Sequence, residues 1–330
     1  MRSEERNGCM TFKKYLWPVV GGLTIALSAW LLYKELRGLS LDDLSVSLLA
    51  ISPAHWLMAG ASSLLAYAAL AGYDRIALMH LGRKVDWFFI TVCSFTTYAL
   101  SHNVGASVVS GAVVRYRAYS TKGLTPAEIG VLIAICSFTF ILGTLLLAGF
   151  VLAYEPELLV RFGDLVPVDA SAATGYLILA LVGLYVVASF LKLRPLKLGS
   201  FNIVYPAPRV VLPQLIIAPI ELIGAAGIIY FALPEVGNPG FMVVLGIFLI
   251  SFSAALLSHA PGGLGVLELV FVMGLPDMNQ ADVIAALLVF RLFYLLIPFA
   301  IALVVILLFE RSQFRRENPP DMQSGHEDGV

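Results

Sequence analysis

Long runs of residues without a charge dominate this sequence and limit the folds open to it. Residues 15–33 contain no Asp, Glu, Lys or Arg, and residues 87–114 contain none either, with His102 as their one titratable basic side chain. A helix needs about 20 apolar residues to cross the hydrocarbon core of a bilayer. Of the 330 residues, 59% are hydrophobic and 13% charged, which leaves too little polar surface for a water-soluble globule. The sequence therefore predicts an all-α polytopic membrane protein.

The apolar runs predict about eight transmembrane helices within residues 15–309. A short cytoplasmic N-terminus, 1–14, precedes them, and the polar residues 310–330 predict a disordered cytoplasmic tail. The first run lacks a cleavage signal, so we expect a retained span. The expected spans are 15–33, 54–73, 87–114, 125–154, 172–191, 210–233, 239–267 and 281–309.

Local patterns sharpen some of these boundaries. Residues 36–51 are too short to span, and their leucines recur at helical spacing beside Asp42 and Asp43, which predicts a helix in the membrane interface. Asp74-Arg75 is expected to close the second span. Thr125-Pro126-Ala127-Glu128 has the pattern of a capping box, which predicts that a helix begins there.

Two apolar runs end in breaks rich in glycine and small polar residues. The first reads S-H-N-V-G-A-S-V-V-S-G over 101–111, and the second reads H-A-P-G-G-L-G over 259–265. Residues 94–105 match residues 251–262 at six of twelve positions, including a Ser-His pair followed by Gly at the same offset. We interpret the breaks as corresponding broken or re-entrant elements of an internal repeat.

The distribution of charge gives the two halves opposite senses in the membrane. Lys and Arg gather at 2–14, 75–84, 115–122, 192–209 and 311–316, whereas the loops at 155–170, 235–239 and 277–282 hold more acid than base. The positive-inside rule then places both termini in the cytoplasm. The first half, about 15–154, and the second half, about 172–309, become inverted four-span repeats. The breaks must line a protein-bounded or wet cavity, because irregular backbone is not tolerated against lipid.

Several strings resemble one known family. They are S-H-N-V-G, G-A-V-V-R-Y-R-A-Y-S-T-K-G-L-T-P-A-E (111–128), P-G-G-L-G-V-L-E (261–268), R-L-F-Y-L-L-I-P (291–298) and Y-D-R-I-A-L-M-H-L-G-R (73–83). Together, and in their order along the chain, they resemble the transmembrane domain of the lysylphosphatidylglycerol synthase/flippase family, which includes stand-alone YbhN-like (UPF0104) proteins and the flippase domain of bifunctional aminoacyl-phosphatidylglycerol flippase/synthetases. The likeness covers about residues 12–312.

The resemblance implies movement of anionic or aminoacylated phospholipid between leaflets. Bifunctional members carry a cytosolic aminoacyl-transferase domain after the last span. This chain ends about 20 residues after its last expected span, so we expect it to lack that domain and not to be an enzyme. The expected location is the bacterial cell inner membrane, as a multi-pass protein.

Charged and polar residues near the breaks are the candidate site. A charge near the bilayer centre costs roughly 2.5–3.5 kcal/mol, so it usually faces a cavity or a partner. Arg291 could bind a lipid phosphate, or form a structural ion pair with Glu268 or Glu221. Arg115 and Arg117 could capture phosphate at the cytoplasmic mouth, or only anchor the chain at the headgroups. The candidate substrate-binding residues are His102, Asn103, Arg115, Arg117, Glu221, His259, Glu268 and Arg291.

Each of the other polar candidates also has two interpretations. Glu268 could pair with a headgroup ammonium or with Arg291, and Glu221 is favoured as a structural partner. His102 and His259 could shuttle protons or bond phosphate, or cap loose backbone groups at a break. The candidate backbone or hinge residues are Gly105, Gly111, Pro261, Gly262, Gly263 and Gly265.

The leading hypothesis is a phospholipid translocase that works by alternating access around the two breaks. The alternatives are a membrane partner subunit of a separate lipid-modifying synthetase, and an intramembrane lipid-headgroup transferase. We expect membrane phospholipids as ligands, no nucleic acid partner, no cofactor and no metal. A separate aminoacyl-lipid synthetase and a homo-oligomeric state stay open as partners.

Overall fold

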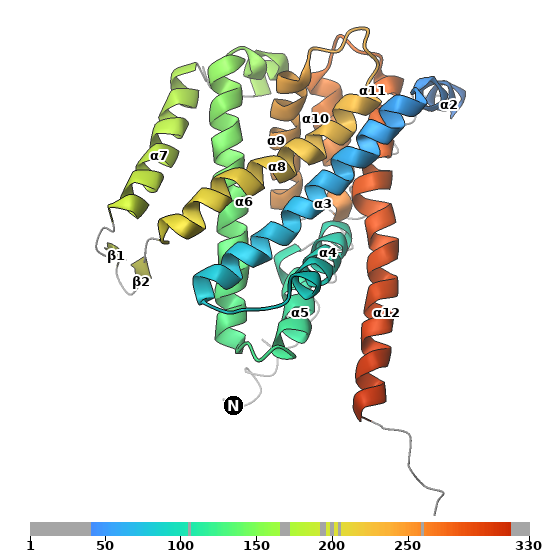
Figure 1. Ribbon diagram of the computed structural model, residues 1–330. Helices are drawn as coiled ribbons and strands as arrows, with labels where there is room; N and C mark the ends of the chain where they lie inside the picture. Colours follow the sequence, from blue (N-terminus) through green and yellow to red (C-terminus); the bar gives the residue numbers. More distant parts are fainter. Residues whose placement is uncertain are drawn as a thin grey trace, which may run out of the picture.

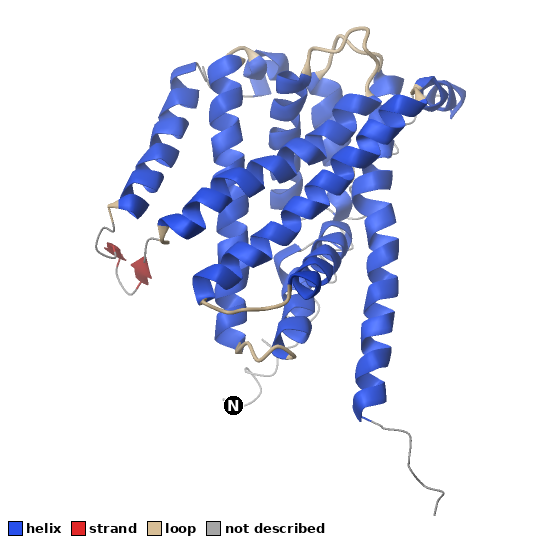
Figure 2. Ribbon diagram, viewed as in Figure 1, coloured by secondary structure: helices blue, strands red, loops and turns tan. Residues whose placement is uncertain are grey.

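The computed structural model describes residues 41–104, 107–165, 172–191, 196–198, 201–203, 206–258 and 261–317. Figure 2 shows helix through most of this chain, with one short antiparallel hairpin of β1 (Leu196–Leu198) and β2 (Phe201–Ile203). The expected first span at 15–33 lies outside the described residues. The remaining elements are α2 (Leu41–Ala50), α3 (Pro53–Leu81), α4 (Trp87–Val104), α5 (Ser107–Ser120), α6 (Pro126–Tyr154), η1 (Leu158–Leu165), α7 (Ala172–Phe190), α8 (Pro208–Ala232), α9 (Phe241–Ser258), η2 (Pro261–Gly263), α10 (Val266–Gly274), α11 (Gln280–Phe290), η3 (Arg291–Leu296) and α12 (Ile297–Glu317).

The all-α polytopic membrane architecture is confirmed. Six helices of the described part are long and apolar enough to cross a bilayer: α3, α6, α7, α8, α9 and the continuous helix Gln280–Phe309. The third expected span, 87–114, is instead divided into α4 and α5. The short helix expected within 36–51 forms as α2, and the capping box at Thr125 and Glu128 forms at the start of α6.

Two helix ends differ from expectation. α3 does not end at Asp74 but continues to Leu81, because Asp74 is fully buried and bonded to a side chain of α5. A charge with such a partner can lie inside a span. At the other end of the chain, α12 continues to Glu317, so residues 310–317 are helical where a disordered tail is expected.

The centre of the molecule is the antiparallel pair α3 and α8, which cross the bundle side by side in Figure 1. Small residues permit the close approach. A Cβ on Gly224 would lie 2.9 Å from the backbone nitrogen of Ala66 and 2.9 Å from the carbonyl oxygen of Ser62. Gly72 of α3 likewise leaves room for the side chain of Ile217 of α8, since a Cβ there would lie 2.5 Å from Cδ1 of Ile217. These contacts join the first half of the chain to the second.

Two helical hairpins enter the bundle from opposite ends of α6 (Figure 1). The open end of the α4–α5 hairpin lies at the start of α6, where Arg83 bonds Glu128 at 2.7 Å. The open end of the α9–α10 hairpin lies at the far end of α6, where Gly246 packs on Val151 and Leu158. The broken elements expected from the sequence are therefore helical hairpins that enter the bundle from opposite ends.

Candidate functional site

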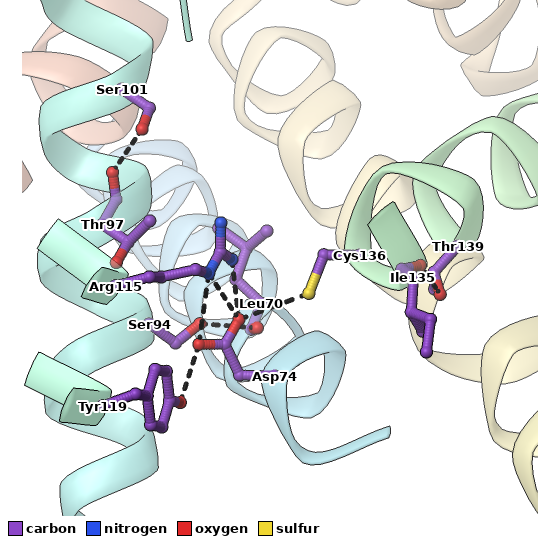
Figure 3. Close-up of polar contacts among 10 residues, drawn as sticks. All are labelled: Leu70, Asp74, Ser94, Thr97, Ser101, Arg115, Tyr119, Ile135, Cys136 and Thr139. Atoms are coloured by element: carbon purple, nitrogen blue, oxygen red, sulfur yellow. Dashed lines mark hydrogen bonds and ion pairs between the residues drawn. The ribbon is translucent and has the colours of Figure 1, made fainter. Parts of the chain in front are cut away.

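The first buried ion pair joins α3 to α5 (Figure 3). Arg115 donates from Nη2 to Oδ1 of Asp74 at 2.6 Å, and from Nε to the same oxygen at 3.2 Å. The relative exposure of the two side chains is 6% and 0%. Tyr119 donates to Oδ2 of Asp74 at 2.8 Å, and the guanidinium carbon of Arg115 lies 4.9 Å from the ring centre of Tyr98. The pair fixes the second arm of the first hairpin to the central helix.

The second buried ion pair joins α10 to η3. Arg291 donates from Nη2 to Oε1 of Glu268 at 2.5 Å and from Nε at 2.8 Å. Its third nitrogen, Nη1, donates to the carbonyl oxygen of Gly262 at 2.8 Å. The other carboxylate oxygen of Glu268 accepts from the amide of Gly265 at 2.8 Å. Of the two pairing partners expected for Arg291, the structure shows Glu268.

The second break depends on backbone that only glycine adopts readily. Gly262, Gly263 and Gly265 have φ values of 60°, 65° and 79°. Gly111 instead permits close packing in the first hairpin, since a Cβ there would lie 2.6 Å from Oγ of Ser101. At these four positions a side chain would strain the backbone or clash with a neighbour. Gly105 lies outside the described residues.

The two hairpin tips meet at η3, a π-helical segment in the last long helix. The amide of Ile297 donates to the carbonyl of Leu292, five residues earlier. In a continuing helix, the amide of residue 298 would donate a hydrogen bond to the carbonyl of Phe293 or Tyr294. Pro298 has no amide hydrogen and cannot form this bond. These two carbonyls accept instead from Ser63 Oγ at 2.8 Å and from Tyr67 Oη at 2.9 Å.

The tip of the first hairpin uses the next carbonyl of η3. Asn103 donates from Nδ2 to the carbonyl oxygen of Leu295 at 3.1 Å. The tip of the second hairpin is held on the same segment through Arg291 and Gly262. The described residues next to both tips thus lie against η3.

A third buried acid lies near the tips. Glu221 of α8 is 1% exposed and accepts from Tyr294 Oη at 2.6 Å and from Tyr73 Oη at 3.3 Å. His102, at the end of α4, stacks on Tyr294 with ring centres 5.1 Å apart. The buried Nδ1 of His102 has no hydrogen-bond partner among the described residues.

The other predicted residues are placed as follows. Arg115 differs from the expectation of a headgroup-facing arginine, because it is buried and held by Asp74, whereas Arg117 is exposed. Pro261 begins η2, and His259 lies outside the described residues. Among the residues that the structure describes, no group of three or more His, Cys, Asp or Glu side chains could hold a metal ion.

The sequence interpretation missed Asp74 and the tyrosines that bond the buried acids. Asp74 lies in an apolar helix, as Arg291 does, so the rule that identified Arg291 would have identified it too. Its neighbour Arg75 made the pair resemble the end of a span. Tyr73, Tyr119 and Tyr294 have no such signal, because buried tyrosine is ordinary in an apolar bundle.

An apolar groove opens beside η3. Its volume is about 750 Å³, and it lies between α2, the start of α3 and the ring of Phe293. Trp56 meets that ring edge-on, with ring centres 5.9 Å apart. The lining residues are Leu48, Leu49, Ile51, Pro53, Trp56, Leu57 and Phe293. Phe293, which lines the groove, is two residues after Arg291 in the chain, so the apolar surface of the groove adjoins the segment that carries Arg291.

Comparison with known proteins finds matches over most of the chain. Residues 19–302 match the family model of the lysylphosphatidylglycerol synthase TM region. An uncharacterized protein of Synechocystis sp., slr0712, is 31% identical over 90% of this chain and 92% of its own length. The inner membrane protein YbhN of Escherichia coli is 30% identical over 74% of this chain and 76% of its own. A phosphatidylglycerol lysyltransferase of Staphylococcus haemolyticus is 27% identical over 92% of this chain but 35% of its own length.

Proposed function

The chain belongs to the family of the lysylphosphatidylglycerol synthase TM region, and from this premise we propose that it moves phospholipids between the leaflets of a membrane. The observation that carries the proposal is the meeting of two re-entrant hairpins, of opposite sense, at one π-helical segment. Broken elements from inverted repeats that meet near the midplane are typical of transporters. Separation of one tip at a time would open the middle of the bundle to one side and then to the other.

The proposed substrate has an anionic phosphate and, in aminoacylated lipids, an ammonium. A phosphate can replace the carboxylate of Glu268 on Arg291, because a guanidinium binds either group through two parallel hydrogen bonds. The released Glu268 is then free to pair with an ammonium of the same headgroup. With an aminoacylated headgroup, such an exchange leaves no buried charge without a partner, which otherwise costs several kcal/mol. The full exchange therefore suits aminoacyl-phosphatidylglycerol, whereas other anionic phospholipids would use the phosphate contact with Arg291 alone.

The acyl chains need an apolar path beside the headgroup. The groove around Phe293 and Trp56 supplies apolar surface next to the segment that carries Arg291. We propose that one acyl chain occupies this groove while the headgroup is bound at Arg291, and that lipid enters from the membrane side of α2 and α3.

Charge at the two ends of the bundle sets the proposed orientation. Arg83 and Lys122 lie at the open end of the first hairpin, and Glu155 and Asp277 lie at the opposite end. The positive-inside rule places the basic end in the cytoplasm, with both chain termini, in the inner membrane of a bacterial cell. The first hairpin then enters from the cytoplasm and the second from the periplasm.

A reconstitution experiment tests the proposal. Purified protein is placed in liposomes with fluorescent phosphatidylglycerol, and dithionite quenching reports the fraction of label exposed outside. We expect quenching beyond the outer leaflet, slowed about tenfold or more by Arg291→Gln, because a charge-assisted hydrogen bond contributes about 1.5–3 kcal/mol. Arg83→Gln is the matched control, since Arg83 has an exposed pair far from η3, and it should transport normally. Quenching equal to that of empty liposomes would contradict the proposal.

One observation favours a second role, as membrane partner of a separate lipid-modifying synthetase. The chain matches 35% of the length of a phosphatidylglycerol lysyltransferase, so it corresponds to a part of a larger protein in that relative. Lipid analysis after deletion separates the two roles. A translocase leaves the aminoacylated lipid present but in the wrong leaflet, whereas loss of a required synthetase partner removes the product.

A further inference from the structure

Glu221 differs from the other buried acids of the bundle. Asp74 and Glu268 are each paired with an arginine. Glu221 lies in the middle of α8 and is 1% exposed, and no Lys, Arg or His of the described chain lies within ion-pairing distance of it. Its only side-chain partners there are the hydroxyls of Tyr73 and Tyr294. A lone carboxylate at such a position requires a compensating cation.

The groups that face Glu221 are neutral or already paired. Tyr73 comes from α3 and Tyr294 from η3, and α9 carries no ionisable residue. α11 has only Asp282, in its first turn, and Tyr185 of α7 bonds Gln214 rather than Glu221. The titratable groups one layer further out are Tyr67 of α3, Tyr98 and His102 of α4, and Cys136 of α6.

A proton is the cation that fits this position. Both oxygens of Glu221 already accept from a tyrosine hydroxyl, and the side chain is enclosed. A metal ion would need several oxygen ligands, and a headgroup ammonium would need room that the packed tyrosines occupy. A proton needs neither, because it adds to one carboxylate oxygen and requires no further ligand.

We propose that Glu221 is a proton-binding site that couples proton binding to the movement of the two hairpins. The coupling part rests on the proposed translocase function, whereas proton binding does not. Tyr73 precedes Asp74, the partner of Arg115, and Tyr294 lies one helical turn after Arg291. Protonation removes the negative charge to which these two hydroxyls donate their hydrogen bonds. A change in the charge of Glu221 therefore changes the hydrogen bonds of α3 and η3, the two segments that hold the hairpin arms.

Infrared difference spectroscopy tests proton binding directly. The purified protein in lipid is titrated with acid while the C=O stretching band of a buried protonated carboxylic acid is followed. We expect a band that rises with acid in the wild type, disappears in Glu221→Gln, and persists in the control Glu235→Gln, whose side chain is exposed. His102→Gln should also keep the band, which separates Glu221 from the histidine that stacks on Tyr294. A band that survives in Glu221→Gln would overturn the assignment.

Transport under a pH gradient tests the coupling. Wild-type proteoliposomes should move labelled lipid at least severalfold faster with a proton gradient of one sign than without it, and Glu221→Gln should lose this response. Lipid movement with no response in the wild type would overturn the coupling and leave the translocase proposal standing. A titrating Glu221 band in a protein that moves no lipid would overturn the translocase proposal and leave the proton site standing.

Discussion

Asp74 and Arg115 place two opposite charges inside an apolar bundle, where each depends on the other. Removal of one partner leaves an uncompensated buried charge, which costs about 3–5 kcal/mol in folded proteins. We therefore expect Asp74→Asn to lower the thermal unfolding temperature of the detergent-purified protein strongly. Arg83→Gln breaks the exposed pair with Glu128 and should cost about 0–1 kcal/mol.

The double variant Asp74→Asn/Arg115→Gln separates the charge effect from the loss of packing. It removes both charges, so it should recover part of the loss caused by Asp74→Asn alone. The measurement is fluorescence-detected thermal unfolding, with size-exclusion profiles as the check of folding. Equal destabilisation by Asp74→Asn and Arg83→Gln would show that the buried pair contributes no more to stability than the exposed pair does.

The contrast between Arg291 and Asp74 shows what the sequence can predict at this scale. Arg291 is a lone charge within an apolar run, and that alone identifies it as a partnered residue. Its partner Glu268 was among the candidates, because it follows the glycine break. Asp74 and Arg115 are separated by a helix, a loop and a hairpin tip, and only the return of α5 against α3 brings them together.

At the scale of elements, the first hairpin depends on one glycine contact. Gly111 of α5 faces Ser101 and Thr97 of α4, where a Cβ would lie 2.6 Å from Oγ of Ser101 and 3.2 Å from Cγ2 of Thr97. We expect Gly111→Ala to force the arms apart and cost about 1–3 kcal/mol. Gly130→Ala is the matched control, because a Cβ at this exposed helical position meets nothing within 4 Å. That change should stabilise the protein by up to about 1 kcal/mol.

A second substitution identifies the clash as the cause. Ser101→Ala removes Oγ, so it should restore part of the thermal stability of Gly111→Ala. The measurement is again the thermal unfolding temperature of each purified variant. If Gly111→Ala and Gly130→Ala shift the unfolding temperature alike, the close approach of α4 and α5 does not contribute to stability.

The last long helix shows the limit of prediction at the same scale. Pro298 marks a place where helical bonding must fail, since it donates no hydrogen bond. The identity of the replacement donors is not local, because Ser63, Tyr67 and Asn103 come from the other half of the chain. The sequence thus predicts the long helix, but the π-helical segment depends on partners that only the tertiary fold supplies.

At the scale of the whole molecule, one series of elements occurs twice in the described chain. A long helix, a helical hairpin and a second long helix follow one another as α3, α4–α5, α6 and again as α8, α9–α10, α11–α12. The repeated Ser-His and Gly pattern predicts the two breaks, and the charge of the loops predicts their opposite sense. The length of the arms and the meeting at η3 follow from packing between the halves, which no single segment encodes.

Opposite entry of the hairpins makes a prediction about the two faces of the membrane. Lys122 lies exposed at the open end of the first hairpin, and the side chain of Asp277, beside the open end of the second, is 79% exposed. Cysteine is introduced at either position in a Cys9→Ser background, where Cys93 and Cys136 are buried. We expect a membrane-impermeant maleimide to label Asp277→Cys in intact spheroplasts and Lys122→Cys only after lysis. The reversed pattern would invert the proposed orientation but keep the architecture. Labelling of both cysteines from one face would contradict hairpins of opposite sense and, with them, the basis for alternating access.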